Sequence, residues 1–232
     1  MPSTNTMAKG RCQERIPTRL CHYTSLSKLV SILESGTLRL NDPAEWEDKN
    51  DAASVLAYLR KTGAEQVRAV SFADGDEQIH HWFEYAHKEY GAGIRFKTPA
   101  LLAALKKEKR FVCGPMCYTP LNELSAKELK TYAPEELPFI KRRPYESEQE
   151  YRVLWTGGLA ETPPAIPVAG LIDCVTLAPG MTKPLPSGVE NPFGPALAEM
   201  LSARYAERYG FKVQQSRLLN SPDWRSLFNK LK

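Results

Sequence analysis

The sequence has no long apolar segment. A membrane-spanning helix needs about 20 consecutive apolar residues, and no run in the 232-residue chain approaches that length. Residues 1–10 are polar and contain no apolar signal core, so secretion is not indicated. We therefore expect a cytoplasmic protein that does not enter a membrane, with residues 1–16 as a polar tail outside the fold.

Cysteine is scarce and irregularly spaced. The chain has 5 cysteines, an odd number without tight regular spacing, which is unlike a disulfide framework and favours reduced thiols. Cys113 and Cys117 are close enough in sequence to share a metal ion, but no second pair or histidine cluster completes a tetrahedral site. We expect no metal centre.

The common catalytic signatures are absent as well. The sequence contains no GxxxxGK[ST] phosphate loop, no GxSxG turn, no HExxH and no GxGxxG that follows a predicted strand. A P-loop ATPase, an α/β-hydrolase, a zinc protease and a Rossmann dehydrogenase therefore have no support.

What the chain does contain is typical of a folded protein. Hydrophobic residues make up 42% and charged residues 25%, which excludes wholesale disorder. Two basic clusters, 106–110 and 141–143, supply much of the net charge of +4. Because 27 acidic residues nearly balance 31 basic ones, solvated helix ends explain these clusters better than a nucleic-acid surface. A nucleic-acid-binding protein remains an alternative.

Short strands and helices interleave along the chain, without the regular alternation of a doubly wound sheet. Strands are predicted over 19–23, 37–40, 67–73, 94–96, 111–118, 148–155, 171–177 and 211–216. A first helix is predicted between a cap at Ser25 or Ser27 and a stop at Gly36. Further helices are predicted over 48–61, 78–90, 99–105 and 195–209, and in parts of 125–143. This order predicts a single α+β domain with a mixed sheet over residues 17–218, followed by a C-terminal extension over 219–232.

The first group of candidate functional residues lies where a strand meets a capped helix. His22 can donate a hydrogen bond to a ligand hydroxyl from this junction, while Tyr23 points to the opposite face and Thr24 follows it. A histidine bonded to a local carbonyl and a tyrosine in the core would explain the same residues.

The second group is aromatic. Trp82 and Tyr85 are about one helical turn apart and could together form a stacking wall for a flat ring. Aromatic stripes on helices more often belong to the core, and core packing is the better interpretation of this pair alone.

The third group is charged. With a strand period of two, Glu148, Glu150 and Arg152 share one face, while Tyr151 and Trp155 share the other. Neighbouring carboxylates repel, so the pKa of one of them should shift unless Arg152 compensates. The alternative is an exposed strand face with weak cross-strand ion pairs.

Taken in order, these residues resemble a bacterial family known only as a domain of unknown function. Its pattern runs from Leu-x-His-Tyr-Thr through Gly-x-Leu, Asn-Asp-Pro, Ser-Phe, Trp-x-x-Tyr and Gly-x-x-Phe to Glu-x-Glu-Tyr-Arg. The matching segments here are 20–24, 36–38, 41–43, 71–72, 82–85, 93–96 and 148–152. The resemblance extends from residue 18 to residue 218, and the ordered set carries it rather than any one motif.

That family is in turn similar to the ADP-ribosyltransferases that use NAD, some of which are toxins or phage-defence effectors. This similarity implies an ADP-ribosyltransferase-like fold, NAD as substrate and a protein or nucleic acid as acceptor. The chain departs from the pattern at Ala73, which stands where a serine is common, so no serine contact is implied there.

The similarity also implies roles for the candidate residues. Glu150 would stabilise the sugar cation that forms when nicotinamide leaves, and Glu148 would orient or deprotonate the acceptor. His22 would hydrogen-bond the ribose on the adenosine side of NAD. Tyr23, Trp82 and Tyr85 would stack on the nicotinamide, and Arg152 or Arg19 would contact a phosphate. Thr24 is a further candidate for cofactor binding. A catalytically inactive relative that binds a nucleotide or a partner protein is the other reading. No feature indicates the oligomeric state.

Overall fold

The computed structural model of the protein describes residues 15–86, 90–182, 187 and 191–231. The chain divides into two compact units, each built from separated stretches of sequence. Among the described helices, none has the length and apolar character needed to cross a bilayer. The expected boundaries of one domain over 17–218, with a tail and an extension, stay a prediction.

Unit 1 contains Thr37–Gly75, Lys97–Pro167 and the described residues up to Leu20. Its strands are β2 (Thr37–Leu38), β3 (Gln66–Asp74), β5 (Phe111–Pro115), β6 (Cys117–Thr119), β7 (Ile140–Arg142), β8 (Glu150–Gly157) and β9 (Ile166–Pro167). Its α-helices are α2 (Lys49–Thr62), α4 (Thr98–Leu105) and α5 (Ala126–Leu129), and its 3-10 helices are η1 (Pro43–Glu45), η2 (Leu121–Glu123), η3 (Pro134–Phe139) and η4 (Arg143–Glu148).

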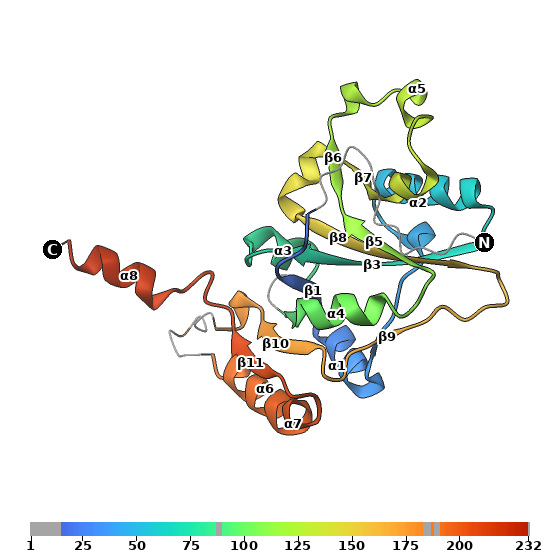
Figure 1. Cartoon of the computed structure of the whole chain (residues 1–232). Coiled ribbons are helices and arrows are strands. Elements are labelled where there is room, and N and C mark those ends of the chain that lie inside the picture. Colours follow the sequence, from blue (N-terminus) through green and yellow to red (C-terminus); the bar gives the residue numbers. More distant parts are fainter. Residues whose placement is uncertain (1–14, 87–89, 183–186, 188–190, 232) are drawn as a thin grey trace. The chain divides into compact units, whose positions relative to one another are not determined.

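Strand β8 is the centre of unit 1, with β3 and β5 antiparallel on its two sides (Figure 1). Both neighbours pair with the same residue, since Arg152 lies opposite Ser71 on β3 and Gly114 on β5. Val55 of α2 packs with Phe139 and Leu154 in a shared apolar cluster. The middle of α2 is thereby packed against the middle of β8.

Unit 2 contains Cys21–Gly36, Asp76–Phe96 and Val168–Lys232. Its strands are β1 (Leu20–Ser25), β4 (Gly91–Phe96), β10 (Ile172–Leu177) and β11 (Lys212–Gln215). Its helices are α1 (Leu26–Ser35), α3 (Ile79–Glu84), η5 (Pro179–Thr182), α6 (Phe193–Leu201), a π-helical turn η6 (Ser202–Ala206), α7 (Glu207–Tyr209) and α8 (Pro222–Asn229).

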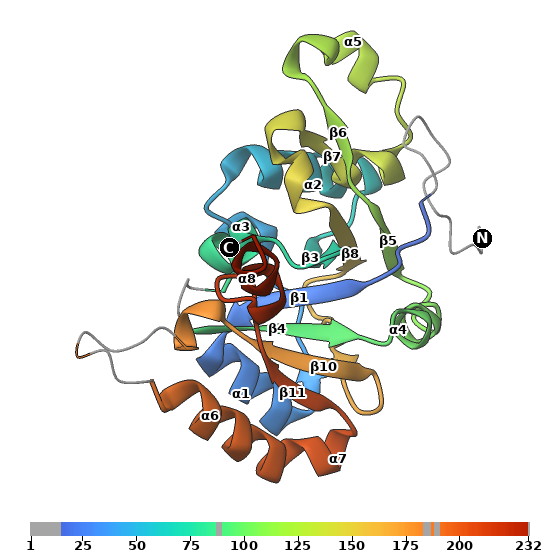
Figure 2. The ribbon, with the colours of Figure 1, turned by 90° about the vertical axis from the view of Figure 1, so that its left-hand side faces the viewer.

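The strands of unit 2 lie in the order β11-β10-β4-β1. Strand β10 is parallel to β11 and antiparallel to β4, so the sheet is mixed, and the fold is α+β as expected. Figure 2 shows α1, α6 and α7 on the same side of these strands. Helix α1 begins at Ser25, whose side chain accepts a hydrogen bond from Lys28, and ends at Gly36 with φ of 70°.

Several sequence-based boundaries need correction. The helix predicted over 78–90 ends at Glu84, and residues 87–89 lie outside the described part of the chain. The segment 195–209 is helical but includes the π-helical turn η6. Cys21, Cys113 and Cys174 are free, whereas Cys117 is disulfide-bonded, so the expectation of reduced thiols fails at Cys117.

Gly63 ends α2 in the left-handed region with φ of 69°, and a Cβ atom added there would meet nothing within 4 Å. We expect Gly63→Ala to lower the free energy of unfolding by about 1 kcal/mol, because an L-residue with a Cβ is strained at this φ. Gly63→Asn is the matched control, since asparagine tolerates this conformation. Urea denaturation should rank Asn above Ala, and the reverse order would contradict the backbone argument.

Candidate functional site

The two glutamates of the charged group belong to different elements. Glu148 is the last residue of η4 and Glu150 is the first residue of β8. Gln149 between them has φ of 46°, the left-handed region, and its carbonyl accepts a hydrogen bond from Asp74 N at 2.9 Å. The expected strand period therefore does not extend to Glu148. The two carboxylates nevertheless meet, because both contact Lys141.

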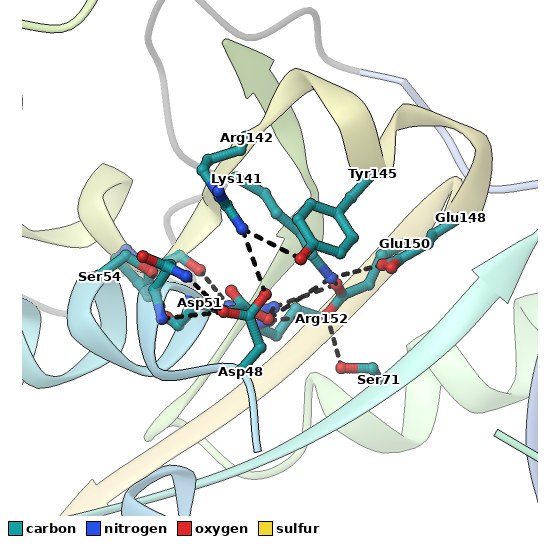
Figure 3. A network of polar contacts seen from close by, with 12 residues as sticks. Asp48, Asp51, Ser54, Ser71, Lys141, Arg142, Tyr145, Glu148, Glu150 and Arg152 are labelled. Carbon is teal, nitrogen blue, oxygen red and sulfur yellow. Dashed lines mark hydrogen bonds and ion pairs between the residues drawn. The ribbon is translucent and has the colours of Figure 1, made fainter. Parts of the chain in front are cut away.

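The Glu150 carboxylate is buried and held by three side chains (Figure 3). Arg152 donates from Nε to Oε1 at 2.7 Å and from Nη2 to Oε2 at 3.0 Å, a bidentate pair. Lys141 Nζ donates to Oε2 at 2.8 Å, and Ser71 Oγ donates to Oε1 at 2.5 Å. Each carboxylate oxygen thus accepts two hydrogen bonds, which holds the side chain in one orientation.

Arg152 is the most deeply buried charge in this group, with a side chain that is 0% exposed. Besides Glu150, it donates from Nη2 to Asp51 Oδ2 at 2.7 Å and from Nη1 to the Pro138 carbonyl at 3.0 Å. Its guanidinium also lies 5.0 Å from the ring centroid of Trp46. All three guanidinium nitrogens are engaged inside the protein, so Arg152 ties β8 to α2 and to the end of η3.

The basic cluster at 141–143 was interpreted as a solvated helix end, and the position of Lys141 shows that this is wrong for Lys141. Its side chain is 7% exposed and its ammonium group faces Glu148, Glu150 and Asp51, the last at 3.4 Å. It lies on β7, not at a solvated helix end. Arg142 and Arg143 are 40% and 65% exposed. The cluster therefore divides into one buried cation and two at the surface.

Electrostatics keeps the network ionised. Burial alone would raise the pKa of Glu150, but Arg152 and Lys141 outweigh it and lower that pKa from 4.5 to about 2. Burial would likewise lower the pKa values of Arg152 and Lys141, yet the neighbouring carboxylates raise both. The pKa of Glu150 is thus lowered rather than raised by carboxylate repulsion, because Arg152, together with Lys141, compensates for the neighbouring negative charge.

Sequence reasoning missed three partners of Glu150 and Arg152, namely Asp51, Ser71 and Lys141. Asp51 looks like part of a helix start, because Asp48 caps α2 and accepts a hydrogen bond from the Asp51 amide. Lys141 sits in a basic run that is typical of a surface. Ser71 belongs to the Ser-Phe motif, which was the one signal in the sequence, and only the structure places it opposite Arg152.

Of the remaining candidate residues, Arg19 lies in unit 1, and the others lie in unit 2. Strand β1 carries His22 and Tyr23, both half-buried, and Thr24, which is 3% exposed. Trp82 is 1% exposed, donates its indole N–H to Glu77 at 2.7 Å and meets the Tyr23 ring edge-on at 5.1 Å.

The two aromatic candidates on helix α3 differ in environment. Trp82 is packed inside the unit, whereas Tyr85 follows the helix and is 43% exposed. They therefore do not share one environment. Their assignment to a nucleotide site, like that of β1, stays a prediction. Among the residues that the structure describes, no cluster of three or more metal-ligating side chains occurs.

Comparison with known proteins gives little information on the function of the chain. No protein-family model and no curated protein matches it. Among solved structures, it is similar to DarT from Thermus sp. 2.9, solved in complex with NAD+, with a TM-score of 0.43 and 14% sequence identity. The alignment covers 88% of this chain and 98% of that one, so it is extensive but loose.

We expect Arg152→Met to lower the free energy of unfolding by about 3–5 kcal/mol, because it leaves Glu150 and Asp51 buried without their main partner. Arg143→Met is the matched control, since Arg143 is 65% exposed and faces Glu146 at 3.7 Å. The control should change stability by less than about 0.5 kcal/mol. Guanidinium denaturation followed by circular dichroism measures both, and equal effects would show that the network adds little to stability.

The lowered pKa of Glu150 also predicts a pH dependence. A folded-state pKa of about 2 against 4.5 means that the unfolded chain binds the proton more readily. The stability from Glu150 is therefore complete above about pH 4.5 and is lost as the pH falls through about 2. Urea midpoints of the wild type and Glu150→Gln should differ most at neutral pH and converge in acid. A difference that is constant with pH would contradict this.

Proposed function

We propose that the protein is an ADP-ribosyltransferase-like enzyme that breaks the glycosidic bond of NAD and transfers ADP-ribose to a macromolecule. The ordered motifs support the reaction class, since they resemble a family similar to enzymes of this kind. The observation that carries the proposal is the Glu150 carboxylate, which is ionised, buried and fixed in direction. Such a preorganised negative charge is what a developing sugar cation requires.

The chemistry follows from the charges. The bond between the ribose carbon and the nicotinamide nitrogen breaks, its electron pair leaves with nicotinamide, and the ribose becomes cationic. A carboxylate near that carbon lowers the barrier because its attraction is stronger in the transition state than in the substrate. The acceptor then attacks the same carbon and loses a proton. We assign the first role to Glu150 and the orientation of the acceptor to Glu148.

The partners of Glu150 refine these roles. Arg152 is 0% exposed and fully engaged, which favours a positioning role for it over contact with a phosphate. Lys141 separates the charges of Glu148 and Glu150 and keeps both side chains in place. We keep His22, Thr24, Tyr23, Trp82 and Tyr85 as the nucleotide-contacting candidates and Arg19 as the phosphate candidate. The proposal also includes a protein or nucleic acid as the acceptor and a role as a toxin or phage-defence effector.

One observation favours a second candidate function. Both oxygens of Glu150 already have protein partners, as in a purely structural ion-pair network. A catalytically inactive relative that binds a nucleotide or a partner protein would retain such a network for stability alone. Catalysis would then be absent even in the intact protein.

Release of nicotinamide from NAD, measured by chromatography with and without cell extract, separates the two. We expect release by the wild type and a loss of at least about 100-fold in Glu150→Gln, because the amide carries no negative charge. Glu146→Gln is the control, since Glu146 lies in η4 with a side chain that is 64% exposed. It should retain wild-type activity.

Folding of each variant is checked by circular dichroism, because Glu150 also supports the core. If the wild-type protein releases no nicotinamide under any condition, the proposed enzyme activity is excluded. The ion-pair network of Glu150 would then have a structural role alone. Full activity in a folded Glu150→Gln protein would exclude Glu150 as the carboxylate that stabilises the sugar cation.

A further inference from the structure

The short strand β6 and the residue before it contact the backbone of Glu150. The hydroxyl oxygen of Tyr118 accepts a hydrogen bond from the Glu150 amide at 2.8 Å. Two residues earlier, the Met116 amide donates to the Glu150 carbonyl at 2.9 Å. Residues 116–118 therefore engage both backbone groups of the residue whose carboxylate carries the proposed function.

The Tyr118 side chain is itself held in place. Its ring packs against the apolar cluster that contains Phe139 and Leu154. Burial, together with the nearby carboxylates of Glu150 and Glu148, raises the pKa of Tyr118, so its hydroxyl is neutral at pH 7. A neutral hydroxyl can accept from the amide without adding a charge to the network.

The strand that pairs with β6 contacts the other end of Glu150. Strands β6 and β7 are parallel neighbours, and Tyr118 lies opposite Lys141 in their register (Figure 2). Lys141 Nζ donates to Glu150 Oε2 at 2.8 Å, while Tyr118 accepts from the amide of the same residue. One strand pair thus contacts Glu150 at both its backbone and its carboxylate.

We propose that Tyr118 sets the position of the Glu150 carboxylate and is therefore a positioning residue for NAD cleavage. Without the hydroxyl, the Glu150 amide loses its acceptor, and the backbone at Gln149 and Glu150 moves to find another. A carboxylate displaced by about 1 Å stabilises the sugar cation less well. The catalytic part of this inference rests on the proposed function, because only a carboxylate that acts on a substrate needs that position for catalysis.

Kinetics of NAD cleavage by Tyr118→Phe, which keeps the ring and removes only the hydroxyl, test the role. We expect kcat to fall roughly tenfold with the KM for NAD unchanged, because Glu150 acts on a charge that develops in the transition state. Tyr58→Phe is the matched control. Tyr58 is 4% exposed, and its hydroxyl has a hydrogen bond with Thr156, near the other end of β8. It should leave both constants unchanged.

A double variant separates positioning from packing, with folding checked by circular dichroism. If Tyr118 acts through the charge of Glu150, Tyr118→Phe should cause no further loss of kcat in a Glu150→Gln background. An equal loss in both backgrounds, an equal loss in Tyr58→Phe, or an unchanged kcat in folded Tyr118→Phe would each overturn the proposal.

An acid titration of the Glu150 carboxyl carbon by NMR, without NAD, gives a measurement that needs no catalysis. The pKa of Glu150, about 2 in the intact network, should rise in Tyr118→Phe and not in Tyr58→Phe. The reason is that a displaced carboxylate loses part of its contact with Arg152 and Lys141, while Glu148 and Asp51 keep their negative charges nearby.

The titration also separates the two proposals. If the wild type cleaves no NAD, the proposed function fails, and a raised pKa in Tyr118→Phe would still show that Tyr118 positions the carboxylate. An unchanged pKa of Glu150 in Tyr118→Phe would overturn the positioning role whether or not NAD is cleaved.

Discussion

The buried guanidinium of Arg152 is the constraint on which unit 1 depends. A charge with no exposure to water is stable only when its neighbours replace the water completely, and here two carboxylates and a backbone carbonyl do so. These partners come from β8, α2 and η3. The same contacts therefore set the position of the central strand, of the first turn of α2 and of the segment that leads into β7.

Around this constraint, the acidic residues take different positions. Glu150 is at the strand start and receives donors from two cations and a serine. Glu148 is displaced from the strand by the left-handed Gln149, yet it meets the same lysine. The network is thus built from sequence positions as distant as 51 and 152, and removal of one member exposes the others to an unfavourable environment.

The ion-pair network around Glu150 and Arg152 is compatible with a catalytic role and with a purely stabilising one. A carboxylate that stays ionised in a low-dielectric surrounding can favour a developing cation far more strongly than one in water. The same partners that keep it ionised also occupy its oxygens.

Local sequence determined the elements with strong boundary signals. Ser25 and Gly36 bracket α1, and Asp48 and Gly63 bracket α2, because caps and left-handed glycines act within a few residues. The alternation after residue 150 predicted β8. The α+β class followed from the order of these elements.

Only the tertiary structure decided what that charged group contacts. From the local sequence, Lys141 looks like a surface cation and Asp51 like part of a helix start. Neither segment of sequence indicates that the Asp51 carboxylate will contact Lys141 and the Arg152 guanidinium in the folded protein. Burial, and with it the direction of every pKa shift, depends on partners far apart in the chain. A cavity of about 320 Å³ in unit 1 is of the same kind, since its walls come from residues 48–61 and 124–145, two segments that are distant in the sequence.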